Sequence, residues 1–415
     1  MDFNPVVLAI PIYFLLIGME LIYQQLRKVK LYRLNDATTN ISCGITQQIS
    51  GLFLKVLAIG LYQWIYQNFR IFTVEPTWYN LLILFVAADF LYYWAHRMSH
   101  EINLFWGGHV VHHQSEDYNL SVALRQSSLQ VIWTFGFYLP LALVGFDTIS
   151  FALMSGLVTV YQFWIHTETI NKMGWLEHIF NTPSHHRVHH GRNPKYIDRN
   201  HAGVFIIWDK MFGTFQKEEE KPIYGITTPL KSWNPFWANI DHYVQIAKSL
   251  KKSSGIKNKL GILFNKPGWF PEEMGGYQKP PEVNTDSYQK YDNSASHKLI
   301  YYALLQYALA MIGTLLFLFH HSNMDMIWKL IIASILVLTI TNCGGLFDRK
   351  LWVKWLEWIR LITIVLMYLI ASFSTYILPY IHTVILTSIS VSVIWFWFLQ
   401  TEFSNHYLKS KILAE

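Results

Sequence analysis

The chain has 415 residues, of which 52% are hydrophobic and only 14% are charged. Soluble domains carry about 25% charged residues, so this composition excludes an ordinary soluble protein and indicates a protein that lies in a membrane. The modest net charge of +6 comes without an RNA- or DNA-binding motif, and the two cysteines, Cys43 and Cys343, are too few and too distant for a disulfide framework or a cysteine-based zinc ribbon.

Nine apolar segments are predicted to cross the membrane, because each approaches the roughly 20 residues that span about 30 Å of hydrocarbon. They are residues 5–23, 45–66, 78–95, 129–144, 148–165, 299–319, 326–341, 358–378 and 381–399. The first is interpreted as a retained helix, since it lacks the basic start and the small-residue cleavage site of a signal peptide. The fourth and fifth form a short hairpin that either spans the bilayer or enters it partway. The predicted fold class is an all-α, polytopic membrane protein with about nine transmembrane helices.

Basic residues between these segments predict the orientation of the chain. The loop 27–33 contains four of them, which places this loop in the cytosol. With nine crossings, the histidine-bearing segments, the polar region 167–296, the basic loop 349–354 and the C-terminus all face the same side. We therefore expect a multi-pass protein of the endoplasmic reticulum in a eukaryote, or of the cytoplasmic membrane in a bacterium.

Eleven of the eighteen histidines lie between residues 96 and 190, and most of them fall into three runs. The runs are His96-x₃-His100, His109-x₂-His112-His113 and His186-x₂-His189-His190, with His166 and His185 between them. Residues three and four apart share a helix face, so each run directs two or three imidazoles toward one point. Imidazole is a ligand of iron, zinc, copper and nickel. Eight or nine such ligands are too many for one ion, so the pattern predicts two metals side by side.

A pair of irons that handles O₂ is favoured over zinc, because a structural zinc site takes four ligands. His185 and His186 are both candidate ligands, since either ring can turn inward. Asp89 lies two turns before His96 in an apolar segment, where it either accepts the ring N–H of a ligand histidine or pairs elsewhere. Glu101 directly follows the first histidine pair and either orients a ligand, binds a polar cofactor or is solvated. Asp89 and Glu101 are the two candidate catalytic carboxylates.

The three runs resemble the signature H-x₃-H, H-x₂-HH and H-x₂-HH of the fatty acid hydroxylase / sterol desaturase superfamily. His166 stands where that superfamily has an intermediate histidine. The segments 115–120, 181–193 and 203–215, together with the membrane block after residue 298, resemble the alkylglycerol monooxygenase family more closely.

The superfamily resemblance covers about residues 83–217, which are predicted to form the di-iron domain. The other predicted parts are N-terminal transmembrane helices over 1–82, a polar cytosolic linker region over 218–297 and C-terminal transmembrane helices over 298–415. Together with the predicted topology, this division places the metal site at the cytosolic face of the membrane.

The resemblance implies an activity: O₂-dependent cleavage of the ether bond of alkylglycerol lipids to a fatty aldehyde and a glycerol derivative. It also implies two non-haem irons and tetrahydrobiopterin as cofactors. Glu101 matches a family glutamate linked to the pterin, so the resemblance makes it a cofactor-binding residue. The expected partners are a membrane lipid as substrate, O₂ and an external reductant, with no nucleic acid.

Two other classes of function remain open from the residues alone. A hydroxylase or desaturase of sterols, fatty acids or carotenoids, fed by an electron-carrier protein, would use the same di-iron centre. A metal transporter or sensor is less favoured, because the histidines gather at one membrane face and do not line a crossing path. The chain lacks a dinucleotide-binding fingerprint, so electrons are expected from a separate protein or from another cofactor.

Overall fold

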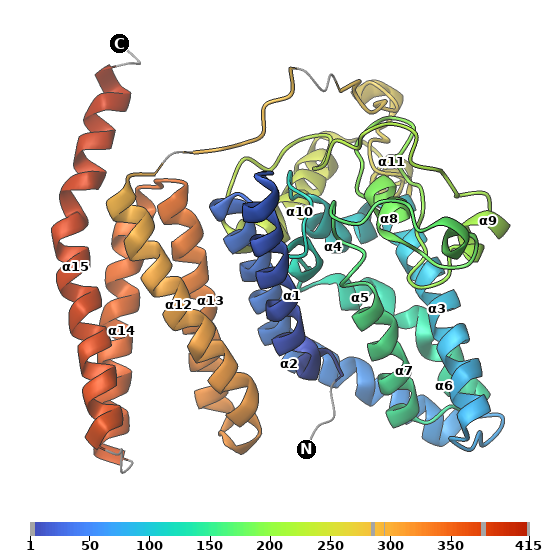
Figure 1. Ribbon diagram of the computed structural model, residues 1–415, viewed down its shortest axis with the longest axis horizontal. Helices are drawn as coiled ribbons and strands as arrows, with labels where there is room; N and C mark the ends of the chain where they lie inside the picture. Colours follow the sequence, from blue (N-terminus) through green and yellow to red (C-terminus); the bar gives the residue numbers. More distant parts are fainter. Residues whose placement is uncertain (1–4, 284–286, 294, 375–378, 413–415) are drawn as a thin grey trace. The chain divides into compact units, whose positions relative to one another are not determined.

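The computed structural model describes residues 5–283, 287–293, 295–374 and 379–412, and within these ranges helices dominate and only two isolated β-bridges occur (Figure 1). The α-helices are α1 (Pro5–Arg27), α2 (Leu34–Phe69), α3 (Trp78–Glu101), α4 (Asn103–His113), α5 (Gln130–Thr134), α6 (Leu139–Val144), α7 (Thr148–Tyr161), α8 (Pro183–His189), α9 (Ile207–Met211), α10 (Pro235–Lys252), α11 (Ile256–Phe264), α12 (His297–His320), α13 (Met326–Phe347), α14 (Trp352–Ser374) and α15 (Pro379–Ile412). The predicted all-α class is confirmed.

Among the described residues, seven helices are long and apolar enough to cross a membrane: α1, α2, α3, α12, α13, α14 and α15. The predicted count of nine is not reached, because the hairpin after residue 128 is too short. Its first arm is divided into α5, a 3₁₀ turn over Phe135–Tyr138 and α6. Its second arm, α7, has 14 residues, which extend about 21 Å at 1.5 Å per residue, less than the hydrocarbon thickness. These lengths fit partial entry into the bilayer.

The chain divides into two compact units, and each is described by itself. The first comprises Met1–Leu230 and Ala238–Tyr291, and the second comprises Lys231–Trp237 and Asp292–Glu415. Cys43 in the first unit and Cys343 in the second are both free and buried, as expected for a chain without a disulfide framework.

The core of the first unit lies where α2, α3, α6 and α7 meet. Tyr62 of α2 stacks on Phe151 of α7 at a centroid distance of 4.3 Å. Leu84 and Ala88 of α3 and Leu141 of α6 pack into the same buried cluster. Large apolar side chains also cover the outer faces of these helices, as expected where lipid and not water is the solvent. This packing holds α3, which carries the first histidine pair.

The N-terminal third of α2 is polar and buried, and it extends the helix well beyond the predicted span 45–66. Asp36 accepts hydrogen bonds from Asn40 (3.0 Å) and from the hydroxyl of Ser115 (2.5 Å). Arg125 donates to the side chain of Asn40 (3.1 Å) and to the carbonyl oxygen of Val111 (2.7 Å). Because Val111 lies within the second histidine run, this network fixes the end of α4 against α2.

The second unit contains a buried ion pair on a membrane-spanning helix. Glu357 and Arg360 of α14 are one turn apart, and Arg360 Nε lies 2.8 Å from Glu357 Oε2. Tyr302 and Gln306 of α12 and Asn342 of α13 complete their hydrogen bonds. Since charges in hydrocarbon are costly unless paired, this network ties three helices of the unit together.

Candidate metal centre

Four stretches of the first unit direct their histidines into one volume. α3 provides His96 and His100 in its last two turns. The chain then turns at Ile102, whose backbone is extended (φ −115°, ψ 117°), so that α4 starts in a new direction with its own histidine run. α8 and the residue after it provide the third run, and His166 follows α7. All nine of these side chains are buried.

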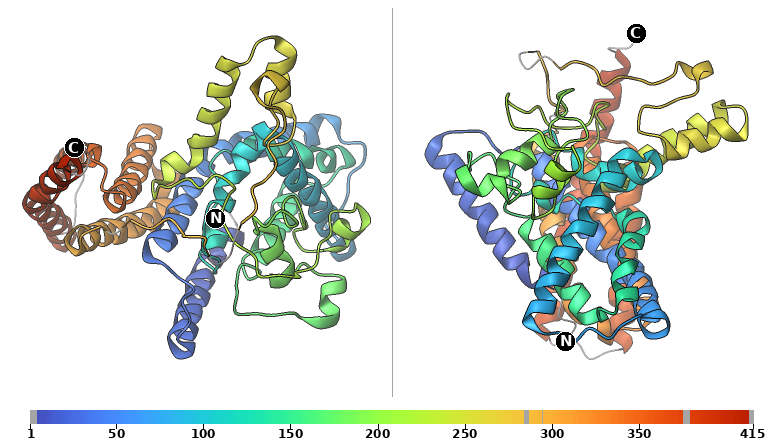
Figure 2. Two further views of the ribbon diagram at one scale, coloured as in Figure 1. Left: turned by 90° about the horizontal axis from the view of Figure 1, so that it is seen from above. Right: turned by 90° about the vertical axis from the view of Figure 1, so that its right-hand side faces the viewer.

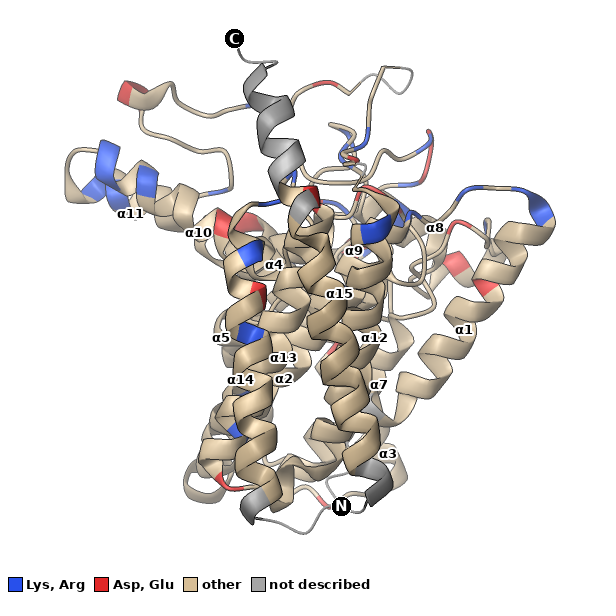
Figure 3. Cartoon of the chain, turned by 90° about the vertical axis from the view of Figure 1, so that its left-hand side faces the viewer, with Lys and Arg blue, Asp and Glu red and all other residues tan. Residues whose placement is uncertain are grey.

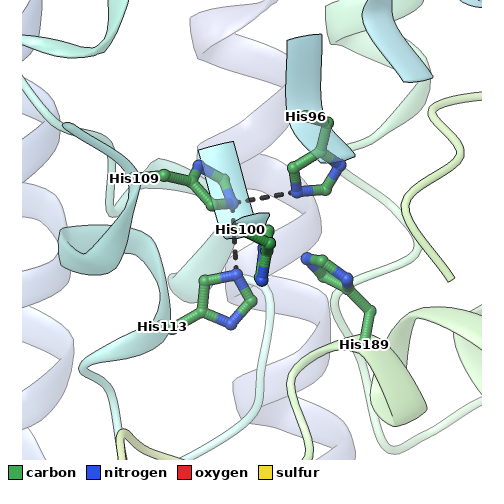
Figure 4. A group of neighbouring side chains, drawn as sticks. All are labelled: His96, His100, His109, His113 and His189. Carbon is green, nitrogen blue, oxygen red and sulfur yellow. Dashed lines mark hydrogen bonds between the residues drawn. The ribbon is translucent and has the colours of Figure 1, made fainter. Parts of the chain in front are cut away.

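The nine histidines form two groups, within each of which the candidate ligand nitrogens lie within 4.8 Å of one another. The five-histidine group consists of His96, His100, His109, His113 and His189. Figure 4 shows these five rings pointing inward from α3, α4 and α8. The four-histidine group consists of His112, His166, His186 and His190. Within the second and third runs, therefore, directly adjacent histidines serve different groups.

Inside each group, ring nitrogens face one another at close range. In the five-histidine group, His109 Nε2 lies 2.9 Å from His96 Nε2 and 3.1 Å from His113 Nε2 (Figure 4). In the four-histidine group, His166 Nε2 lies 3.1 Å from His112 Nε2 and 2.9 Å from His186 Nε2.

The positions of the ring protons on His112 and His166 indicate that a cation fits between the two rings. The Nδ1 atom of His112 lies 2.9 Å from the carbonyl oxygen of Arg125, and that of His166 lies 2.7 Å from the carbonyl oxygen of Gln162. A carbonyl only accepts, so both Nδ1 atoms carry the proton. Both Nε2 atoms of these neutral rings then present lone pairs to each other at 3.1 Å. Two facing lone pairs repel, whereas a metal ion between them would bind both.

The same proton assignment holds in the five-histidine group. The Nδ1 atoms of His96 and His189 donate to the carbonyl oxygens of His201 (2.7 Å) and Arg199 (2.9 Å). The Nε2 atom of His189 is buried and has no hydrogen-bond partner. A buried lone pair without a partner is unfavourable, and backbone carbonyls on the far nitrogen are the usual support of metal-binding histidines. Both groups therefore fit a metal ion.

The two groups are neighbours. The rings of His113 and His190, one from each group, stack with a centroid distance of 4.5 Å, and those of His186 and His189 stack at 5.1 Å. Ions held by the two groups would therefore lie side by side, as the sequence predicts. Neither group contains a carboxylate, so the site differs from the glutamate-rich di-iron sites of helical bundles.

Burial keeps these imidazoles in the neutral form that binds metals. Desolvation lowers the pKa of His112 to about 4. Burial together with the neighbouring histidines lowers the pKa values of His113 and His190 well below the ordinary 6.5. Proton competition for the ligand nitrogens is therefore weak at neutral pH.

These lowered pKa values predict that the metal-free chain loses stability in mild acid. Between pH 6.5 and about 4 the unfolded chain binds protons at His112 that the folded chain does not bind, so the free energy of unfolding falls as the pH falls. Thermal unfolding of the metal-free protein in detergent should show a decreasing midpoint from pH 7 to pH 5. A His112→Gln/His190→Gln variant should show a shallower slope, and a wild-type midpoint that stays constant over this range would contradict the assignment.

Asp89 is buried on α3 but does not contact a ligand histidine in the described hydrogen bonds. Its carboxylate accepts from the backbone amides of Val204 (2.7 Å) and Phe205 (3.0 Å) and from the indole of Trp208 (2.9 Å). A Cβ at Gly203 would come within 2.6 Å of Asp89 Oδ1, so only glycine allows this approach. The carboxylate of Asp89 therefore does not accept the ring N–H of a ligand histidine but pairs elsewhere. It anchors the segment 203–208, which follows His201 in the chain.

Glu101 lies at the end of α3, where its carboxylate is 3.0 Å from Arg97 Nε and partly accessible. Another acid near the histidine runs is occupied elsewhere: Asp117 pairs with Arg33 and Lys290. Neither these contacts nor those of Glu101 include a ligand histidine.

His185 and His201 lie near the histidine groups without belonging to either. The ring of His185 packs edge-on against Phe215, whereas the adjacent His186 belongs to the four-histidine group. His201 is fully buried, and its ring centroid lies 5.0 Å from that of His100. Its backbone carbonyl orients His96. No spacing signal could have revealed this, because His201 reaches the site through a loop.

Comparisons with known proteins agree with this geometry. The family model described as fatty acid hydroxylase matches residues 81–214, a range that contains all nine histidines of the two groups. The chain is 41% identical to human alkylglycerol monooxygenase over 349 residues, which cover 82% of this chain and 77% of the relative. It is 38% identical to the alkylglycerol monooxygenase of Xenopus tropicalis, over 81% of this chain and 76% of the relative.

A more distant match is ornithine lipid hydroxylase OlsE of Rhizobium tropici, 27% identical over 34% of this chain and 43% of the relative. No solved structure gives a significant match. The long and strong matches, together with the histidine groups inside the matched domain, lead to one conclusion: the chain belongs to the alkylglycerol monooxygenase family.

Proposed function

We propose that this membrane-bound, O₂-dependent monooxygenase cleaves the ether bond of alkylglycerol lipids by hydroxylating the alkyl carbon next to the ether oxygen. The observation that carries the proposal is the pair of facing Nε2 lone pairs on His112 and His166, which a cation between them would stabilise, in a group of ligands without a carboxylate. The relatives named alkylglycerol monooxygenase support the substrate class. They do not favour the alternative of a sterol, fatty acid or carotenoid hydroxylase or desaturase.

The position of the site suits an ether lipid. His96 and His100 lie in the last two turns of α3, a helix long enough to span the membrane. The end of such a helix lies near the boundary between acyl chains and headgroups. The ether bond of a glycerol lipid lies at that same depth, so the alkyl carbon could reach the histidine groups while the glycerol stays near water.

Two irons, bound through the nine histidines, would supply the activation of O₂ that side chains cannot perform. The chain itself holds the imidazoles neutral and fixed: carbonyl oxygens of residues 125, 162, 199 and 201 set the ring orientations. Tyr118 and Trp106 pack against rings of the two groups, Tyr118 against His190 and Trp106 against His113. The hydroxylated product is a hemiacetal, which collapses to a fatty aldehyde and a free glycerol hydroxyl.

The proposed function includes a reductant and a membrane side for the metal centre. Tetrahydrobiopterin is proposed as reductant from the family resemblance, with the accessible carboxylate of Glu101 as its binding residue. The basic loop 27–33 connects α1 and α2, and alternation through α2 and α3 returns the chain to the side of that loop. The positive-inside rule then puts the histidines on the cytosolic side, of the endoplasmic reticulum or of a bacterial cytoplasmic membrane.

Isotope labelling tests the proposed reaction. The iron-loaded chain in detergent is supplied with a 1-O-alkylglycerol, tetrahydrobiopterin and ¹⁸O₂, and the aldehyde is reduced at once to the alcohol. We expect one ¹⁸O in that alcohol and none in the glycerol, since the inserted oxygen becomes the aldehyde oxygen. The matched 1-O-acylglycerol, whose carbonyl carbon has no C–H bond, should not react. A hydroxylated or unsaturated lipid with its ether intact, or turnover without pterin that needs an electron-carrier protein, would contradict the proposal.

A further inference from the structure

The lysine-rich segment from the end of α10 through α11 has a composition unlike the rest of the first unit. Residues 248–266 contain six lysines and no Asp or Glu. All six lysines are exposed, at positions 248, 251, 252, 257, 259 and 266. Figure 3 shows Lys and Arg, in blue, gathered on α10 and α11, and both views of Figure 2 show these helices projecting outward from the first unit. Such a charge run attracts an anionic surface.

An exposed apolar stripe lies between these lysines. Ile256, Leu260 and Phe264 are spaced four residues apart, so they share one face of α11. Their exposed fractions are 72%, 47% and 51%. Lys257 and Lys259 flank this stripe on either side. A helix with an apolar face and lysines beside it is the kind that lies in the plane of a membrane surface.

The opposite face of α11 is attached where α3 leaves the membrane. Ile262 is 1% exposed, and its carbonyl oxygen accepts a hydrogen bond from the side chain of Asn103 at 2.8 Å. The backbone amide of Asn103 donates to the carbonyl oxygen of Asn265 at 3.0 Å. Asn103 is two residues beyond the end of α3, a candidate membrane span. These bonds join α11 to the chain just beyond the end of α3, and the apolar stripe lies on the face of α11 away from Ile262.

A cavity beside this segment has the chemistry of a headgroup site. It has a volume of about 410 Å³, and its lining includes Lys248 and Lys252 on α10 and Phe270 and Met274 opposite. Two ammonium groups suit a phosphate, and the apolar side chains suit the adjoining glycerol and acyl carbons. The cavity thus continues the combination of positive charge and apolar surface seen along α11.

We propose that α11 and the end of α10 form a membrane-surface anchor that binds anionic phospholipids of the bilayer in which the chain is embedded. The lysines contact phosphate groups, and Ile256, Leu260 and Phe264 enter the headgroup–acyl boundary. Because α11 is bonded to the residue that starts α4, this anchor holds α4 and its histidines at a constant depth. The anchor does not depend on the identity of the substrate or of the reductant.

A spin label on α11 tests the anchor in the full-length chain. Leu260→Cys introduces a single exposed cysteine, since Cys43 and Cys343 are buried. The labelled protein is placed in nanodiscs of phosphatidylcholine with or without phosphatidylglycerol, and the collision rates of the label with O₂ and with a water-soluble nickel chelate are measured. In discs with phosphatidylglycerol we expect high O₂ and low nickel accessibility. A label on Lys217→Cys, at an exposed loop position, should remain accessible to the nickel chelate.

Charge reversal provides the matched comparison. Lys257→Glu/Lys259→Glu should lower the ratio of membrane-inserted to aqueous label about tenfold or more, whereas Lys172→Glu/Lys217→Glu, two exposed lysines elsewhere, should leave it unchanged. Three outcomes would overturn the proposal: nickel accessibility at position 260 equal to that at position 217 in every lipid, dipolar broadening that reveals a second copy of the chain on this face, or insertion that the Lys257→Glu/Lys259→Glu change does not alter.

Discussion

Replacement of His112 by alanine is expected to lower turnover by at least about a hundredfold and to remove metal from the four-histidine group. Loss of an outer support residue alone costs 10- to 100-fold in metal affinity, so loss of a ligand should cost more. His189→Ala should act in the same way on the five-histidine group. Iron content and initial rate, measured on each purified variant, test both expectations.

The adjacent pair His185 and His186 provides the matched control. Both are buried histidines of α8, but only His186 belongs to a histidine group. His186→Ala should lose iron and activity, while His185→Ala should keep its iron even where the lost contact with Phe215 lowers the unfolding temperature. Full iron content and activity in His112→Ala, His189→Ala and His186→Ala together would show that these rings do not hold the metals.

Replacement of Asp89 by alanine is expected to destabilise the fold and to loosen the metal centre from a distance. The change leaves three donors without their acceptor: the buried amide of Val204, and the partly buried amide of Phe205 and indole of Trp208. Each unsatisfied donor costs about 1–3 kcal/mol, so a loss of roughly 3–5 kcal/mol in the free energy of unfolding is expected, near the upper end of single substitutions. Thermal unfolding in detergent measures it.

The effect of Asp89→Ala on iron follows from the segment that Asp89 anchors. That segment begins just after His201, whose carbonyl oxygen orients His96. Iron should therefore leave faster from Asp89→Ala than from the wild type when a chelator is added. Glu75→Ala, at an exposed acid just before α3, should match the wild type in both measurements. A stable Asp89→Ala protein with unchanged iron release but no turnover would instead identify Asp89 as a catalytic carboxylate.

Features that depend on local spacing could be predicted from the sequence. The three histidine runs lie on helices or helix ends, and spacings of three and four residues determine which rings share a face. The spans α1, α2 and α3 follow from their apolar length. The assignment of neighbours within a run to two groups, such as His112 and His113, was not predicted, because it depends on how α3, α4 and α8 cross.

Features that depend on tertiary contacts could not be predicted. Asp89 has the heptad spacing of a support residue for His96, yet its carboxylate is turned toward the 203–208 segment, which lies more than a hundred residues later. Backbone carbonyls take the support role for His96 and for three other histidines of the two groups, and carbonyls carry no sequence signal. The hairpin after residue 128 has an apolar composition typical of spans, but a 3₁₀ turn and Pro140 divide its first arm.

Imidazoles from α3, α4, α8 and the segment after α7 are expected to hold two metal ions between them. The most direct test is an experimental density map of the anaerobically purified, iron-loaded chain, with anomalous scattering or X-ray absorption to identify the metal. We expect two iron peaks per chain, one within His96, His100, His109, His113 and His189 and one within His112, His166, His186 and His190. Rings that point apart, with no metal density between them, would contradict it.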